Sequence, residues 1–171
     1  YHAHSGQPGE PGEPIIRHHA LRLRFLNARE APEVLSQGIQ PGAYNYLLGN
    51  DPKRWAGNAH AFSSVVQRGL YPGVDLRIRG GDTGLKYDLI LAPESDPRAI
   101  LFTYEGSDGL VIGPERLLVR TSLGDLVETI PLAYQEVDGT RIPVTCRYRA
   151  VSGEVGFELG PHDLSLPVVI D

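Results

Sequence analysis

The feature that most constrains this chain is a two-residue alternation of apolar and polar side chains, interrupted again and again by glycine and proline. Around residues 21–25, for example, Leu21, Leu23 and Phe25 alternate with Arg22 and Arg24. Such alternation is typical of a β-strand with one buried side and one solvent-facing side. The 20 glycines and 14 prolines leave little room for long helices and favour tight turns between short strands.

Turn residues separate further segments of the same kind and predict hairpins. Residues 74–79 and 85–91 flank a glycine-bearing loop, and Asp138-Gly139 and Ser152-Gly153 are short hairpin turns. Short strands separated by turns about every 8–12 residues are typical of sandwiches and barrels. We therefore predict an all-β fold, an antiparallel β-sandwich or distorted barrel of about 11–12 short strands with no long helix.

The best helical candidate covers residues 31–37. It lies between Pro32 and Gly38 and is too short to be stable alone, so we expect one helical turn there at most.

The chain divides into a short N-terminal arm and one domain. Residues 6–14 form three consecutive Gly-X-Pro triplets, which predict a flexible, polyproline-like arm or loop over residues 1–18. His2 and His4 lie in it, two residues apart, and whether they bind a metal is left open. Residues 19–171 have the length of a single β-rich domain.

Composition excludes several classes of protein. The chain has 16 Lys and Arg against 21 Asp and Glu, and a net charge of −5 argues against a nucleic-acid partner. No apolar run approaches the ~20 residues of a membrane span. The single cysteine, Cys146, excludes an internal disulfide, and it alternates in phase with Val144 and Tyr148 as a small core residue. We predict no catalytic, cofactor-binding or metal-binding residues, and no cofactor.

Two carboxylates are the strongest candidates for catalysis. Asp75 and Asp88 lie on the two strands of the hairpin at 74–91, close enough to form the acid pair of a glycoside hydrolase. However, Asp75 lies on the same side of its predicted strand as Arg77, and Asp88 lies on the same side as Lys86. Cross-strand ion pairs on a solvent-facing side explain these residues without catalysis.

The aromatic residues are candidates for binding. Most of the tyrosines alternate onto the apolar side of their strands, so we expect them in the core. Trp55 is the exception, because it follows a polar loop that contains Asn50 and Asp51. It either closes one end of the sandwich or is presented to a partner. We predict Trp55, Asn50 and Asp51 as partner or ligand contacts, and exposed aromatics suit a carbohydrate-binding module as the alternative.

Five stretches of the sequence, taken in order, carry a resemblance to a known family; they cover residues 44–55, 70–76, 85–89, 133–139 and 166–171. They resemble the N-terminal β-rich domain associated with SBBP-type β-propeller repeats in exported bacterial proteins. The chain resembles the C-terminal part of that domain, whose members have further strands upstream. The resemblance implies an all-β extracellular or cell-surface module, and the family carries no established catalytic residues to transfer.

We therefore expect a non-catalytic structural, adhesion or assembly module of a larger secreted or cell-surface bacterial protein. If upstream strands belong to the sheet, their absence leaves unpaired strand edges, which favour a protein partner that binds by β-strand addition. That partner is either the upstream segment or a neighbouring copy. Two alternatives remain, a carbohydrate-binding module that uses exposed aromatics such as Trp55 and a glycoside hydrolase that uses Asp75 and Asp88.

Overall fold

A computed structural model describes residues 17–81 and 84–171 and shows an all-β sandwich, as predicted. The only helical segments in the described residues are two single 3-10 turns, η1 (Pro52–Arg54) and η2 (Pro97–Ala99). The predicted arm over residues 1–18 lies outside the described residues except for its last two, and His2 and His4 lie outside them as well. No described helix has the length and apolar character needed to span a membrane.

One layer of the sandwich is a seven-stranded antiparallel sheet in the order β13-β12-β16-β7-β6-β5-β2. The strands are β13 (Thr140–Val144), β12 (Ala133–Val137), β16 (Val168–Ile170), β7 (Gly84–Leu91), β6 (Val74–Gly81), β5 (Phe62–Tyr71) and β2 (Glu33–Ile39). The two hairpins predicted from the turn residues within this sheet are present, because β6 pairs with β7 and β12 pairs with β13.

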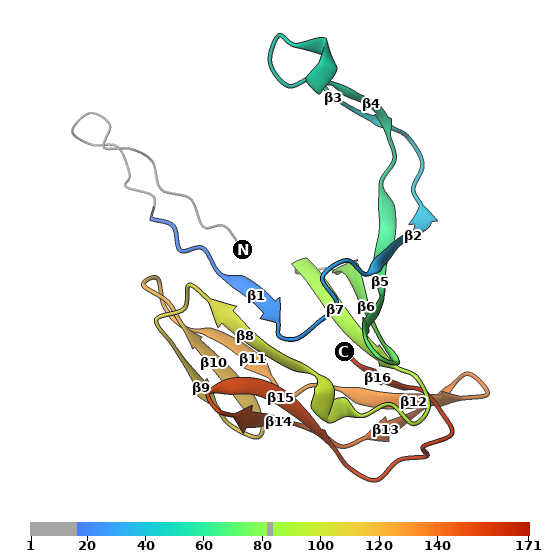
Figure 1. Ribbon diagram of the computed structural model, residues 1–171, viewed down its shortest axis with the longest axis vertical. Coiled ribbons are helices and arrows are strands. Elements are labelled where there is room, and N and C mark those ends of the chain that lie inside the picture. The colour runs from blue at the N-terminus through green and yellow to red at the C-terminus, as the bar shows by residue number, and fades with distance from the viewer. Residues whose placement is uncertain (1–16, 82–83) are drawn as a thin grey trace.

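Two smaller antiparallel sheets complete the body of the molecule (Figure 1). The first has the order β1-β8-β15-β14, and the second has the order β11-β10-β9. Their strands are β1 (Arg22–Phe25), β8 (Leu101–Glu105), β15 (Glu154–Leu159), β14 (Cys146–Val151), β11 (Leu126–Thr129), β10 (Arg116–Arg120) and β9 (Gly109–Ile112). The predicted hairpin at Ser152-Gly153 joins β14 to β15.

The hydrophobic core lies where the sheets meet, around Phe102 of β8. The Phe102 ring is fully buried, and its centroid lies 5.5 Å from Phe157, 6.0 Å from Phe25 and 6.2 Å from Tyr104. Leu89 of the seven-stranded sheet belongs to the same buried cluster. A single apolar cluster therefore fixes the layers against one another.

A long hairpin extends away from this body and ends in a small two-stranded sheet (Figure 1). We call residues 39–62 the arm from here on; it is a different segment from the N-terminal arm predicted over residues 1–18. It contains β3 (Tyr44–Tyr46), η1 and β4 (Ala56–Ala59), and it continues from the paired strands β2 and β5. Every arm residue is exposed except Ala59 and Ala61, which are half-buried. The arm therefore has no layer packed against it in the described chain.

Two details of the sequence-based prediction were wrong. Residues 33–37 of the predicted helical turn at 31–37 belong instead to the strand β2. Each of them pairs with a residue of β5, and this pairing with a neighbouring strand outweighs the local preference. The described residues also contain sixteen strands instead of 11–12. Part of the excess comes from the arm, and part comes from the segment between the turns at Asp138-Gly139 and Ser152-Gly153, which divides at Thr145 into β13 and β14 of different sheets.

The contrast between body and arm predicts unequal effects of two matched substitutions. Phe102→Ala leaves a cavity in the core, so we expect it to lower the free energy of unfolding by about 3–5 kcal/mol. Phe62→Ala lies on the exposed hairpin, where Phe62 is 42% exposed, and we expect a loss below about 1 kcal/mol. Urea denaturation of dilute protein measures both. Equal losses would contradict a free arm.

Candidate functional site

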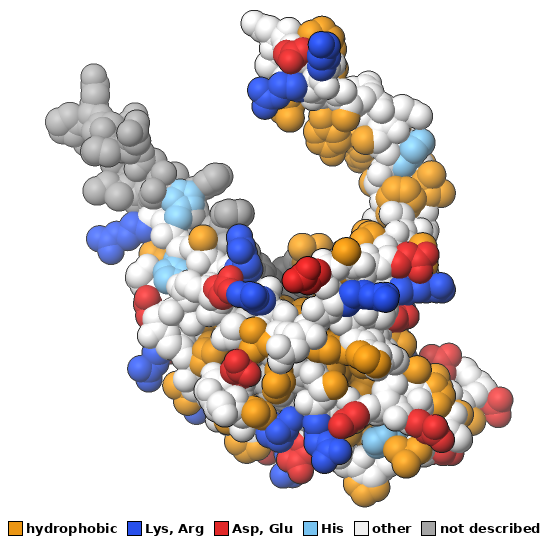
Figure 2. Space-filling model, viewed as in Figure 1, with side chains coloured by type: hydrophobic (Ala, Val, Ile, Leu, Met, Phe, Trp, Pro, Cys, Tyr) orange, Lys and Arg blue, Asp and Glu red, His pale blue; other side chains and the backbone are white. Residues whose placement is uncertain are grey.

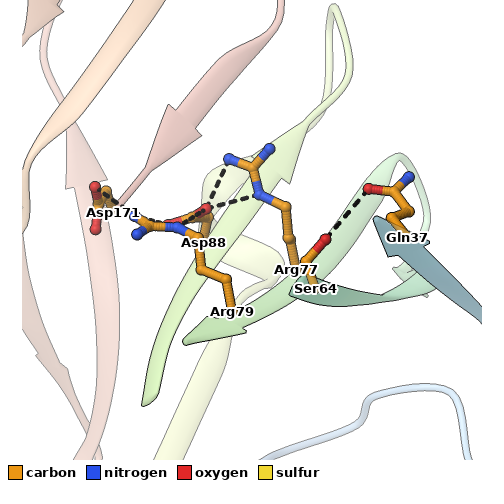
Figure 3. Close-up of polar contacts among 6 residues, drawn as sticks. All are labelled: Gln37, Ser64, Arg77, Arg79, Asp88 and Asp171. Carbon is orange, nitrogen blue, oxygen red and sulfur yellow. Dashed lines mark hydrogen bonds and ion pairs between the residues drawn. The ribbon is translucent and has the colours of Figure 1, made fainter. Parts of the chain in front are cut away.

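The two carboxylates predicted as an acid pair lie on neighbouring strands but are not paired with each other. Asp88 of β7 lies opposite Arg77 of β6, whereas Asp75 lies opposite Ile90. Arg77 Nη2 is 2.6 Å and Arg79 Nε is 3.0 Å from Asp88 Oδ2. Arg79 Nη2 also donates to Asp171 Oδ2 at 2.9 Å, so one guanidinium bridges two carboxylates (Figure 3).

Asp75 has a separate role. Its Oδ1 accepts a hydrogen bond from the backbone N–H of Gly69 at 2.7 Å. Gly69 has a positive φ of 63° at the irregular part of the β5–β6 pairing, so Asp75 stabilises a bulge in the hairpin. Asp75 and Asp88 therefore each make a different contact that stabilises the fold.

The prediction of solvent-facing ion pairs was partly wrong. Asp88 is only 1% exposed, although it lies on the same side of β7 as the exposed Lys86. The side chains of Arg77 and Arg79, each about one-third exposed, enclose its carboxyl group. Burial by itself would raise the pKa of Asp88, but hydrogen bonds from Arg79 and Arg77 outweigh it and hold the pKa below its ordinary value.

We expect Asp88→Asn to lower the free energy of unfolding by about 2 kcal/mol at neutral pH, because two guanidinium groups lose their buried counter-ion. A carboxyl group whose pKa is lowered by folding stabilises the fold above its unfolded pKa and loses that effect as the pH falls through its folded pKa. The difference between wild type and variant should therefore shrink below about pH 4. Thermal unfolding from pH 3 to 7 measures it, and a constant difference would contradict the ion-pair role.

An open groove lies between the sheets, beside β1 and β7. It consists of two adjoining hollows of about 430 and 350 Å³ that share Leu85, Lys86, Tyr87 and Glu128. The larger hollow is lined mainly by apolar residues, including Leu21, Leu23, Phe25, Leu76 and Ile78, and the smaller one includes Val127, Ile130, Leu132 and Tyr148. We call this feature the groove.

Glu128 is the acidic group that both hollows share. The hydroxyl of Tyr104 donates to Glu128 Oε1. The hydroxyl of Tyr148 lies 3.4 Å from Glu128 Oε2 and 3.0 Å from the carbonyl oxygen of Thr129. No ion pair within the described chain involves Glu128. The groove thus holds a half-buried carboxyl group with hydroxyl donors but no cation bound to it.

This environment determines how the groove titrates. Burial raises the pKa of Glu128 above its ordinary value, against the opposing effect of hydrogen bonds from Tyr104 and Tyr148. Burial also raises the pKa of Tyr87, Tyr104 and Tyr148, so all three hydroxyls stay protonated at neutral pH. Lys86 lines both hollows as well.

We expect Glu128→Gln to stabilise the isolated chain at pH 7 by about 1 kcal/mol, because it removes the cost of keeping a charge in an apolar groove. A carboxyl group whose pKa is raised by folding costs nothing while protonated and destabilises the fold as the pH rises through its folded pKa. The gain should therefore appear above about pH 4 and grow towards neutrality. Urea denaturation across this range measures it, with exposed Glu115→Gln as the control. A loss of stability would contradict this account.

The predicted contact residues lie together at the tip of the arm. Trp55 is 43% exposed, and its Nε1 donates to the carbonyl oxygen of Gly49 at 3.0 Å. Asp51 Oδ1 accepts from the backbone N–H of Lys53 at 3.0 Å and caps η1, and Asn50 is exposed beside it. Of the two positions considered for Trp55, closure of the sandwich is excluded, because this loop lies at the end of the arm away from the body (Figure 1).

Some tyrosines predicted in the core are exposed. Tyr71, Tyr104 and Tyr148 are buried as expected, but Tyr44 is 57% and Tyr46 is 53% exposed on the arm. Alternation identifies the two sides of a strand, but it does not show that another layer covers the apolar side.

Glu128 is the residue that the sequence reasoning missed. In β11 it lies on the same side as Leu126, which packs against the core, so it is a charged residue on the apolar side of its strand. Such a break in the pattern was the available signal, since local rules are violated most often at functional sites.

The other candidates are structural in the described residues. Cys146 is buried, and burial raises the pKa of its thiol to about 12, as expected for a core residue. His19 joins two loops through Gly106 and Ser122. Within residues 17–81 and 84–171, no three His, Cys, Asp or Glu residues gather in an arrangement that could hold a metal ion.

Comparison with known protein families identifies a matching family model. A family model described as "Domain of unknown function (DUF7948)" matches residues 1–171. No curated protein and no solved structure matches the chain.

Proposed function

The chain belongs to the DUF7948 family, and from its structure we propose that it is a non-catalytic structural, adhesion or assembly module. In this proposal it is part of a larger secreted or cell-surface bacterial protein and acts by holding a protein partner. The resemblance to domains associated with SBBP-type repeats supports the extracellular location.

The arm is the observation that carries this proposal. Large apolar side chains are exposed along it, and Figure 2 shows them on its surface with basic side chains near the tip. They are Ile39, Tyr44, Tyr46, Leu47, Leu48, Trp55 and Phe62, with exposed fractions from 42% to 64%. An apolar surface of this extent on a soluble domain is typical of a protein-interaction site.

The strand edges support the same proposal. In the described chain, β1 and β14 end one sheet, and β2 and β13 end the seven-stranded sheet. The outer side of an edge strand offers unpaired backbone groups to an added strand. β1 is the best placed of these edges, because its residues also line the groove.

The carboxylate contacts favour a module of this kind over a glycoside hydrolase. In a glycoside hydrolase, one carboxyl group must be free to act as the acid and the other as the base or nucleophile, and both must reach the same sugar. Asp88 is enclosed by two arginines, and Asp75 is bound to the backbone of Gly69. Neither is presented to a substrate.

A carbohydrate-binding module is the second candidate, because Trp55, Tyr44 and Tyr46 are exposed aromatics on one arm. Both candidates place the contact on the arm, so Trp55→Ala weakens binding in either case. The nature of the partner distinguishes them.

The test is binding of the labelled chain to cells of the organism that encodes it, before and after protease treatment of the cells. We expect binding that protease removes, that Trp55→Ala lowers at least 10-fold, and that leaves a glycan array without signal. An exposed apolar control on the body, Leu164→Ala, should bind normally. Protease-resistant binding together with a glycan signal would establish the carbohydrate-binding module instead, and turnover of a glycoside that is lost in Asp88→Asn would establish the hydrolase.

A further inference from the structure

The arm and the groove are two exposed apolar surfaces on one chain, and they do not contact each other. Every hydrogen bond that residues 39–62 make in the described chain is to another residue of the arm or of the β2–β5 hairpin. The tip lies away from the body in Figures 1 and 2. A chain therefore cannot cover its own groove with its own tip in this conformation.

The tip and the groove each carry charged groups that form no ion pair within the described chain, and these include groups of opposite sign. The arm contains Lys53 and Arg54 and one acidic residue, Asp51, whose carboxyl group caps η1. Lys53 and Arg54 are exposed and form no ion pair within the described chain. The groove contains Glu128, which has no cationic partner there, together with Lys86 and with Asp171, which is bound to Arg79.

The tip of the arm and the groove also both expose large apolar side chains. Trp55, Leu47 and Leu48 stand beside the basic pair at the tip, and each is at least 43% exposed. In the groove, Leu85 is 73%, Leu132 is 67% and Val127 is 54% exposed around Glu128. Aromatic and arginine side chains seated in an apolar pocket are the usual centres of protein interfaces.

We propose that the tip of the arm docks into the groove of a second copy of this chain, with Trp55 and the adjacent leucines in the apolar hollows and Arg54 paired with Glu128. This inference rests on the proposed assembly function and names its partner. Because every copy carries both surfaces, the partner is present at equal concentration wherever the protein is made.

The arrangement in the fold favours a reciprocal pair. β1 and β7, which contribute residues to the groove, lie on the side of the body from which the arm rises (Figure 1). Two copies that face each other across a two-fold axis each insert an arm and each receive one, which closes the assembly as a dimer. The half-buried Glu128 carboxyl group, which has no cation bound to it in the described chain, gains one in the pair.

The test uses two variants that leave the core unchanged. The arm variant combines Trp55→Ala with Arg54→Glu, and the groove variant is Leu85→Arg, at a side chain that is 73% exposed. The control is Leu164→Arg, at an exposed leucine outside the groove. Circular dichroism and thermal unfolding establish that each variant is folded, and sedimentation equilibrium measures the dissociation constant.

We expect wild type and Leu164→Arg to be dimers and both the arm and the groove variant to dissociate at least 30-fold more readily. Mixing the two variants should form a dimer in which one of the two contacts is intact, because the intact arm of one fits the intact groove of the other. A second pair, Arg54→Glu with Glu128→Arg in the same chain, should recover part of the affinity that Arg54→Glu alone loses.

Three results would overturn the inference: a monomeric wild type at about 100 µM, where interfaces of useful affinity are occupied, a dimer that neither variant weakens, and a mixture that stays monomeric. Cell binding separates this failure from failure of the proposed function. If wild type is monomeric while Trp55→Ala still abolishes protease-sensitive cell binding, the assembly function stands and its partner is another protein.

Discussion

The structure depends on one constraint: the apolar side of an antiparallel sheet is stable in water only where a second layer covers it. The body meets it around Phe102, where the two main sheets share one buried cluster. The β2–β5 hairpin continues past the end of that layer, and its apolar side chains stay exposed from Ile39 to Phe62. The arm is therefore the continuation of a paired strand hairpin of the sheet into solvent.

Two carboxyl groups show how the same constraint acts on charge. Asp88 is almost completely buried, and two guanidinium groups compensate for its lost hydration and keep it ionised. Glu128 is half-buried, has only hydroxyl donors, and its pKa is raised. The first arrangement serves the fold, because removal of the arginines would leave the buried Asp88 carboxylate without a counter-ion. The second leaves a carboxyl group in an open apolar groove without a cation, which is why we assign Glu128 to binding.

Much of the fold could be predicted from alternation and turn residues. The hairpins at 74–91, at Asp138-Gly139 and at Ser152-Gly153 are all present, because their signals are local. Alternation could not tell which apolar side has a covering layer, so Tyr44 and Tyr46 were expected in the core. The groove around Glu128 depends on contacts between strands of different sheets, such as β11 with β8. No local pattern contains that information.

The irregular strands of the arm are poorly suited to pair with the edge strand of another molecule. We infer that the arm makes its specific contact through side chains and not through backbone edges. A long flat edge strand with apolar side chains would pair with any other edge and aggregate. The arm is interrupted instead: β3 and β4 are short, their register shifts between Tyr44 and Tyr46, and η1 closes the tip with Lys53 and Arg54. What remains available is an aromatic, two leucines and two cations. A groove with apolar walls and one unpaired carboxyl group has the matching chemistry.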